Sequence, residues 1–286
     1  MNVTETSFLN QVRSINSVDW FITNRCNDVC KFCYAPPFKE HQYQLEHYKQ
    51  IARRIKQLNF EWVTLCGGEP TMHPHIVEIV QYLKELGLKV TFYSNGININ
   101  VLAKVYSYVD IISLPIDSIE DTTGNLRSKL QQKRVMECIE MLSKLNWQPK
   151  VKIGTVATKQ NLADLPLIQQ LIEKYPIITI WRIYQFSPAE RAKQYEQLYS
   201  VDAQEFHKAV QERTDNIQNH HYQISGRSRD SNRGYCVIMD QEGDLYRYEE
   251  QYIRIEKNIL TSGVEEIGEH YSLDTHREQK NWLSQA

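Results

Sequence analysis

The chain has 286 residues, and its 33 Lys and Arg against 35 Asp and Glu give a formal net charge of −2 at pH 7. Apolar residues make up 41% and charged residues 24%, which is typical of a globular protein and excludes a disordered or collagen-like chain. No apolar run approaches the roughly 18 residues of a membrane-spanning helix, and the near-neutral charge removes the simplest case for binding a nucleic acid polymer. Residues 1–20 lack a secretory signal, so we predict a cytoplasmic protein with no membrane role.

Short β-type runs alternate with longer helical runs over the first 186 residues. The composition of these runs predicts strands at residues 18–23, 62–65, 89–93, 110–116, 150–157 and 177–186. The apolar spacing between them predicts helices at residues 43–58, 76–86, 129–145 and 165–174. This alternation indicates an α/β fold with a mainly parallel sheet, in which the loops after the carboxyl ends of the strands carry the chemistry.

The pattern changes after residue 186. A helix is predicted at residues 202–210, capped by Asp202, and a polar, basic loop at residues 227–233. Residues 236–239 and 245–248 are predicted to form a hairpin, and from about residue 258 the chain is polar and thinly apolar. Without a repeat or linker, we predict a single domain with a core at residues 1–186 and a C-terminal extension at residues 187–286 that completes a substrate site.

Three of the six cysteines lie within eight residues, at Cys26, Cys30 and Cys33. A disulfide scaffold would be shorter and more cysteine-dense. Three thiolates can hold three corners of a [4Fe–4S] cube and leave one iron open to another ligand. Phe32 and Tyr34, beside the thiolates, would shield such a cluster from water.

A structural zinc site is the alternative for these three cysteines. Its fourth ligand would be His41, His47 or Cys66. An open metal position suits a reactive site, whereas a structural site is closed by its ligands.

The spacing Cys-x3-Cys-x2-Cys after the first strand, with Gly67-Gly68-Glu69-Pro70 after the second, resembles the radical S-adenosylmethionine (SAM) superfamily. The resemblance implies a partial (β/α)6 barrel with a C-terminal elaboration. It implies that the open iron of a [4Fe–4S] cluster binds SAM. Reduction of the cluster would cleave SAM to methionine and a 5′-deoxyadenosyl radical that abstracts a substrate hydrogen. An electron donor such as flavodoxin or ferredoxin is implied as a partner.

The resemblance also implies roles for residues after the second and third strands. Gly67 and Gly68 would let the backbone approach the amino group of SAM, and Glu69 would pair with that cation. Ser94 and Asn95 follow the third strand, where members of the family contact the SAM ribose. A simple Asn-Gly turn is the alternative for Ser94 and Asn95.

Further SAM contacts are implied near the end of the fourth strand. Arg127 suits a bidentate grip on the methionine carboxylate, and a solvated arginine at a helix start is the alternative. The other residues expected to contact SAM in this region are Ser113, Asp117 and Ser118.

Within the superfamily the chain is similar to the viperins and their prokaryotic relatives, from about residue 18 to residue 267. The similar stretches are residues 111–118, 152–156, 181–186, 234–243 and 263–266. Viperins dehydrate a nucleoside triphosphate, CTP in animals, to its 3′-deoxy-3′,4′-didehydro form, which terminates viral RNA chains. The resemblance therefore implies an antiviral lyase, and the start of the chain near the first strand is expected to match the prokaryotic arrangement without a membrane helix.

The viperin resemblance implies substrate residues as well. Lys152 and Arg182 match basic positions that would bind the triphosphate, and Tyr235 matches a tyrosine that would donate hydrogen or a proton to the intermediate. A half-buried strand tyrosine is the alternative for Tyr235. Gly154 and Ile180 depart from the family, which usually has asparagine and arginine at these positions.

The basic loop would supply further cations through Arg227, Arg229 and Arg233, although such a loop is also typical of solvated surface. Two other functions remain open. One is another radical SAM enzyme acting on a sugar, nucleoside or peptide, and the other is a non-catalytic iron–sulfur or zinc protein. Peptide-modifying members commonly carry a further cysteine cluster near the C-terminus, where this chain has only Cys236.

Overall fold

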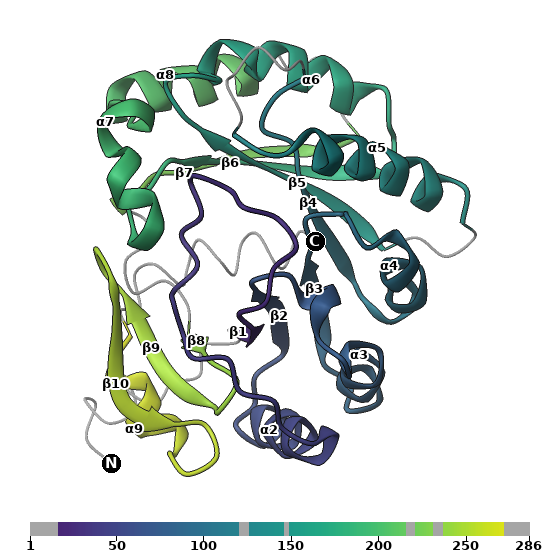
Figure 1. Cartoon of the computed structure of the whole chain (residues 1–286), viewed down its shortest axis with the longest axis vertical. Coiled ribbons are helices and arrows are strands. Elements are labelled where there is room, and N and C mark those ends of the chain that lie inside the picture. The colour runs from purple at the N-terminus through teal and green to yellow at the C-terminus, as the bar shows by residue number, and fades with distance from the viewer. Residues whose placement is uncertain (1–16, 120–125, 146–148, 216–220, 231–236, 272–286) are drawn as a thin grey trace, which may run out of the picture. The chain divides into compact units, whose positions relative to one another are not determined.

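The computed structural model describes residues 17–119, 126–145, 149–215, 221–230 and 237–271 (Figure 1). The chain forms two compact units that interleave in sequence. The first unit consists of residues 1–25, 38–92 and 231–286, and the second of residues 26–37 and 93–230. Parallel strands alternate with helices in both, so the predicted α/β class with a parallel sheet is confirmed. The division at residue 186 stays a prediction.

The first unit contains strands from both ends of the chain. They are β1 (Ser17–Thr23), β2 (Trp62–Gly67), β3 (Lys89–Tyr93), β8 (Val237–Met239), β9 (Asp244–Tyr248) and β10 (Tyr252–Asn258). Their order is β10-β9-β8-β1-β2-β3, in which β8, β1, β2 and β3 are parallel and β9 and β10 are antiparallel to their neighbours. Tyr93, the last residue of β3, belongs to the second unit.

The helices of the first unit include α2 (Leu45–Gln57), α3 (Ile76–Glu85) and α9 (Val264–Gly268). Helices α2 and α3 lie side by side (Figure 1). Each helix buries one apolar stripe, which consists of Tyr48, Ile51, Ala52 and Ile55 in α2 and of Ile76, Ile79, Val80 and Leu83 in α3.

The second unit contains the parallel strands β4 (Ile111–Pro115), β5 (Lys150–Ala157), β6 (Ile178–Gln185) and β7 (Gln223–Arg227), in that order. Its helices are α4 (Ile99–Val105), α5 (Lys129–Ser143), α6 (Leu165–Glu173), α7 (Glu196–Tyr199) and α8 (Ala203–Asp215). Helices α5, α6 and α8 each lie in the connection between two consecutive strands, as the alternation predicts.

The sheet of the second unit has one helix-covered face and one polar face. Gly226 lies against α8, since a Cβ at Gly226 would be 2.9 Å from Val210 Cγ1, and Gly226 is the register partner of Ile183. Side chains alternate between faces along a strand, so the neighbours of Gly226 and Ile183 point away from α8. Residues on this other face include Lys152, Arg182, Tyr184, Ser225 and Arg227, together with the apolar Ile180.

Several elements were not predicted from the sequence. These are α4, α7, β7, β10 and α9. Arg227 was expected to begin a loop but is the buried last residue of β7, so that boundary is wrong. The Gln223–Arg227 segment has one large apolar residue, Ile224, so its composition gives little strand signal. The predicted hairpin is confirmed by the antiparallel pair β8 and β9. In the described parts of the chain, no helix is both long enough and apolar enough to span a membrane.

Candidate functional site

The cysteine loop is an irregular segment of the second unit. Cys26 is exposed, whereas Cys30 and Cys33 are partly buried, and a turn brings the Cys33 amide within 3.2 Å of the Cys30 carbonyl oxygen. The Cys30 thiol points toward Asp28, with 3.7 Å between Sγ and Oδ2. Burial raises the pKa of Cys30 to about 12, although the positive charge of Arg127 opposes this shift.

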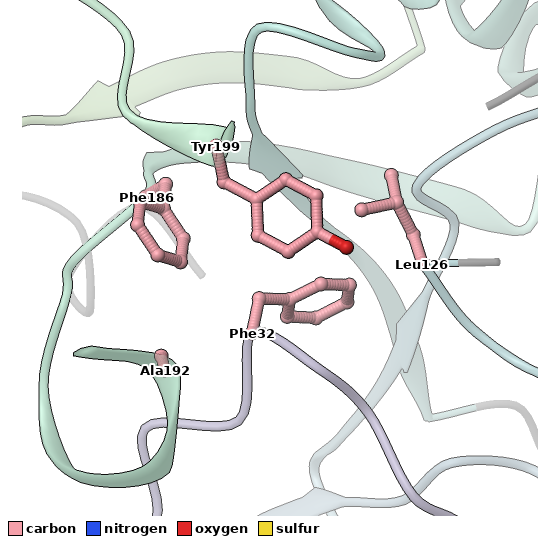
Figure 2. Close-up of a cluster of buried hydrophobic side chains, with 5 residues drawn as sticks. All are labelled: Phe32, Leu126, Phe186, Ala192 and Tyr199. Atoms are coloured by element: carbon pink, nitrogen blue, oxygen red, sulfur yellow. The ribbon is translucent and has the colours of Figure 1, made fainter. Parts of the chain in front are cut away.

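Phe32 anchors the middle of the cysteine loop. Its side chain is buried in an apolar cluster that Figure 2 shows, with Leu126, Phe186, Ala192 and Tyr199 around it. Cys30 packs against the same cluster. Phe32 therefore fixes the backbone between the second and third cysteines, whereas Tyr34 is 46% exposed.

Arg127 joins the cysteine loop to the end of β4. Its Nε donates to Oδ2 of the buried Asp117, and its Nη1 lies 3.2 Å from Cys30 Sγ. The guanidinium carbon lies 4.9 Å from the centroid of the Phe32 ring. Oδ1 of Asp117 accepts a hydrogen bond from the Val156 amide at 2.6 Å. Arg127 is therefore placed by its partners and is not a solvated helix-start residue.

Asn95 is part of a turn and also faces the cysteine loop. Its Oδ1 accepts from the Ile97 amide at 3.0 Å, and Ser94 Oγ accepts from the Gly96 amide at 3.0 Å. Its Nδ2 donates to Asn27 Oδ1 at 2.7 Å and lies 4.0 Å from Cys26 Sγ. Asn95 therefore forms the Asn-Gly turn and also presents its side-chain amide to the cysteine loop, so the turn does not exclude the predicted contact with SAM.

The two serines of β4 and its following loop differ in their surroundings. Ser113 is buried within β4, and its carbonyl oxygen accepts from the Ser94 amide at 3.1 Å. Ser118 accepts from the Gln132 side chain through both its hydroxyl and its carbonyl oxygen, at 2.7 and 2.9 Å. Ser113 thus lies next to the Asn95 turn, while Ser118 is bound by α5.

Gly67 and Gly68, in the first unit, pack against the backbone that follows β1. The Gly68 amide donates to the Thr23 carbonyl oxygen at 2.7 Å. A Cβ at Gly67 would lie 2.2 Å from Thr23 O, and one at Gly68 would lie 2.3 Å from Arg25 O. Gly67 also has a φ of +138°, which disfavours a side chain. Backbone packing alone therefore requires both glycines, and their expected approach to SAM stays a prediction.

Glu69 is almost fully buried, with 1% of its surface exposed. Its Oε1 accepts hydrogen bonds from the amide and the hydroxyl of Thr71, at 3.1 and 2.7 Å. These bonds cap the short helical turn Pro70–Met72. The carboxylate is thereby held in one orientation at the end of β2.

Glu40 of the first unit connects the chain before the cysteine loop with the chain after it. Its Oε1 accepts from the Thr23 hydroxyl at 2.8 Å, and its Oε2 accepts from the Asn24 amide at 2.5 Å and from Gln241 Nε2 at 3.2 Å. Sequence reasoning missed this residue because it belongs to no motif. Its position seven residues after the last clustered cysteine was the one available signal.

Replacing Glu40 with alanine is expected to lower the free energy of unfolding by about 1–2 kcal/mol, because three donors lose a shared acceptor. Denaturant titration of the metal-free protein measures this change. Glu46→Ala is the control, since Glu46 bonds to the surface residue Arg53 and its loss should have little effect. Equal losses in the two variants would show that Glu40 does not hold the loop ends.

Lys152 is more deeply buried than the other predicted substrate residues that the structure describes, with 1% exposed surface. Its Nζ donates to the hydroxyls of Tyr93 at 2.5 Å and Tyr184 at 3.4 Å. Arg182, on the neighbouring strand, is also buried and donates through Nε to Ser225 Oγ at 3.2 Å. The structure thus brings Lys152 and Arg182 to one face of the sheet, and it adds two tyrosines that the sequence did not single out.

The three arginines of the predicted basic loop do not share one environment. Arg227 is buried on the polar face of β7. The Arg229 amide donates to Gln185 Oε1 at 2.9 Å, while its side chain is 46% exposed and 4.0 Å from Glu196. Arg233 and the predicted catalytic Tyr235 lie outside the described residues. Of the described arginines of this loop, Arg227 is therefore the one that lies on the same face of the sheet as Arg182 and Lys152.

The cysteine loop suits an iron–sulfur cluster by the chemistry of its donors. Three cysteine thiols lie within eight residues, and the described cysteines form no disulfide. Thiolates are the ligands that such clusters require. In the portions of the chain that the structure covers, no three side chains of His, Cys, Asp or Glu are already gathered as a metal site. Cluster binding would therefore draw the three thiols together and release their protons.

Known sequences place this site in a family. The sequence model of the Radical SAM superfamily matches residues 20–172, which is more than half of the chain. A protein of Flammeovirga pacifica, named S-adenosylmethionine-dependent nucleotide dehydratase, is 26% identical over 279 residues, covering 90% of this chain and 92% of that protein. A protein of the same name from Lacinutrix mariniflava is 25% identical, and the alignment covers 93% of this chain but 58% of that protein.

Solved structures with a similar fold are also known. SuiB of Streptococcus suis, bound to its precursor peptide SuiA, has a TM-score of 0.70 at 14% identity, covering 97% of this chain and 70% of that one. A second structure, anSMEcpe with bound AdoMet and a peptide, has a TM-score of 0.67 at 15% identity, covering 92% and 81%. The cysteine spacing, the Gly-Gly-Glu-Pro turn and the match of the superfamily model over residues 20–172 agree: this chain belongs to the radical SAM superfamily.

Proposed function

We propose that this chain dehydrates a nucleoside triphosphate to its 3′-deoxy-3′,4′-didehydro form. The observation that carries the proposal is the buried group of Lys152, Arg182 and Arg227 on one face of the sheet, on an enzyme of the radical SAM superfamily. Buried cations on a polar face suit a highly charged anion such as a triphosphate. The names of relatives that align over most of the chain support the same substrate class.

The cofactor end of the site would be held by the cysteine loop and its neighbours. Cys26, Cys30 and Cys33 would ligate a [4Fe–4S] cluster. Bound SAM and this cluster, reduced by a donor such as flavodoxin or ferredoxin, supply the one-electron chemistry that removes a hydrogen atom from an unactivated C–H bond. Asn95 and Arg127, which already face Cys26 and Cys30, would orient SAM. The other residues proposed to contact SAM are Gly67, Gly68, Glu69, Ser94, Ser113, Asp117 and Ser118.

The polar face of the second unit would bind the phosphates of the nucleotide, and the ribose would then face SAM. Lys152, Arg182 and Arg227 would provide charge-assisted hydrogen bonds, each worth about 1.5–3 kcal/mol. The hydrogen atom from C4′ would end in 5′-deoxyadenosine, and the 3′-hydroxyl would leave as water with one proton and one electron. The nucleotide thus loses one water, while each turnover takes two electrons from the donor, one for cleavage of SAM and one for the substrate. Tyr235 stays the proposed donor of hydrogen or a proton to the intermediate, and Arg229 and Arg233 stay proposed phosphate contacts.

The proposal is tested with the reconstituted, reduced protein, SAM and each of CTP, UTP, GTP and ATP. We expect at least one nucleotide to accelerate formation of 5′-deoxyadenosine and to yield a product that is one water lighter by mass spectrometry. If no nucleotide accelerates this reaction or loses water, the alternative of a sugar or peptide substrate replaces the proposal.

Replacing Lys152 with methionine is expected to raise the nucleotide concentration needed for half-maximal rate by about ten- to a hundredfold, because one charge-assisted contact is lost. Slow cleavage of SAM without nucleotide should persist. Lys150→Met is the matched control, since Lys150 is on the same strand at its first residue and should leave the requirement unchanged. An unchanged requirement in Lys152→Met would remove Lys152 from the substrate site.

A further inference from the structure

Two tyrosine hydroxyls surround the buried ammonium group of Lys152. Besides the two hydrogen bonds from Lys152 Nζ, the hydroxyls of Tyr93 and Tyr184 lie 3.4 Å from each other. The ammonium group also lies 4.1 Å from the centroid of the Tyr93 ring. A buried ammonium group needs partners that replace water, and these phenols supply two of them.

Tyr184 lies among cations from three neighbouring strands. Arg182 precedes it by two residues on β6 and therefore shares its face, Arg227 is its register partner on β7, and Lys152 comes from β5. A Cβ at Gly154 would lie 3.4 Å from Tyr184 Cε2, so the ring of Tyr184 packs over this glycine. The Tyr184 hydroxyl is thus held within the polar face rather than at its edge.

The surroundings of Tyr184 favour its ionised form. Burial raises its pKa, but Lys152 and Arg182, the hydrogen bond with Tyr93, and Arg227 lower it by more, to about 8. Among the described residues, these four groups are the charged and titratable neighbours that act most strongly on Tyr184, and they come from β5, β6, the end of β3 and β7. Burial raises the pKa of five other tyrosines, namely Tyr43, Tyr48, Tyr199, Tyr222 and Tyr246.

We propose that Tyr184 is a specificity-determining residue whose hydroxyl, when ionised, is an internal anion among Lys152, Arg182 and Arg227 and competes with a phosphate oxygen of the substrate for these cations. The ligand class is a polyphosphate. Identifying that ligand as the triphosphate of a nucleotide rests on the proposed function, whereas the anion site itself requires no dehydration chemistry. The field that stabilises a phenolate also attracts another anion, so the two compete for the same cations.

The competition fixes the sign of the pH dependence. A bound polyphosphate repels the phenolate, so it binds better to the protein with a protonated Tyr184. Below pH 8 the phenol is already protonated and affinity is highest. Above pH 8 each binding event takes up one proton, and the affinity falls by up to about tenfold for each further pH unit.

The test uses the full chain and inorganic tripolyphosphate, which has no ribose and cannot react. The near-ultraviolet phenolate absorption is followed across pH 8 with and without tripolyphosphate, and binding is measured by calorimetry at the same pH values. We expect one tyrosine to ionise near pH 8, its ionisation to move to higher pH with tripolyphosphate, and the affinity to fall above pH 8.

Two conservative variants separate Tyr184 from other groups. Tyr184→Phe should lose the early phenolate signal and remove the part of the pH dependence that is additional to ionisation of tripolyphosphate itself. Tyr93→Phe should keep the signal at a higher pH, because Tyr184 loses one hydrogen bond from its neighbour. If Tyr184→Phe retains the early signal, or shows the same pH dependence of binding as the unmodified protein, the proposal is overturned.

The outcomes also distinguish this inference from the proposed function. Tripolyphosphate binding with the expected pH dependence, but no nucleotide that loses water, would support the role of Tyr184 and refute the dehydratase. Nucleotide dehydration without an early tyrosine ionisation would support the dehydratase and refute the role of Tyr184.

Discussion

Replacing Cys26, Cys30 or Cys33 with alanine is expected to abolish the iron–sulfur cluster. The unmodified chain should take up about four iron and four sulfide on anaerobic reconstitution, because three thiolates can hold one cube with an open iron. Each variant should fall to background in iron and sulfide analysis, lose the oxygen-sensitive visible absorption, and form no 5′-deoxyadenosine from SAM.

Cys66 and Cys138 provide matched controls for these substitutions. Both are buried away from solvent, burial raises the pKa of Cys66 well above its usual value, and Cys138 Sγ donates to the Gly96 carbonyl oxygen at 3.4 Å. Cys66→Ala and Cys138→Ala should retain the cluster. Stoichiometric zinc with no iron uptake in the unmodified chain, or loss of iron in Cys66→Ala, would contradict the ligand set and favour the zinc alternative.

The core strands and helices were predictable because they bury regular apolar patterns. The predicted strands at residues 89–93 and 150–157 match β3 and β5, and the helix predicted at 165–174 matches α6 to one residue. The missed strand β7 lacks such a pattern, since only Arg227 among its residues is buried. Its position is set by pairing with β6, which is a tertiary interaction that local sequence does not encode.

The site was predictable where a motif carries it and not where packing builds it. The cysteine spacing identified the loop, but Phe32 fixes that loop through a cluster assembled from distant residues. Lys152 and Arg182 were expected, while Tyr93 and Tyr184 joined them only through the register of parallel strands and the fold of β3. Glu40 was hidden for the same reason, because its partners are separated from it by 16 to 201 residues.

Asp117 is the main partner that holds the Arg127 side chain in place. The sequence predicted both residues as separate contacts to SAM, whereas the structure pairs them with each other. The Asp117 side chain is 2% exposed and its two oxygens are used by Arg127 and by the Val156 amide. Arg127 in turn reaches Cys30, so the pair links the end of β4 to the cysteine loop.

Replacing Asp117 with alanine is therefore expected to lower the free energy of unfolding of the metal-free protein by up to about 3–5 kcal/mol, because the Arg127 side chain, which is only 17% exposed, loses its charged partner. Asp117→Asn should lose less, since its remaining oxygen can still accept from the Val156 amide. Denaturant titration measures both changes, and Arg127→Met alone and combined with Asp117→Ala completes a double-mutant cycle. Each single substitution leaves its charged partner unpaired, whereas the double substitution removes both charges. The double variant should therefore lose clearly less free energy of unfolding than the sum of the two single losses. Strictly additive losses would show that Asp117 and Arg127 do not stabilise the loop as a pair.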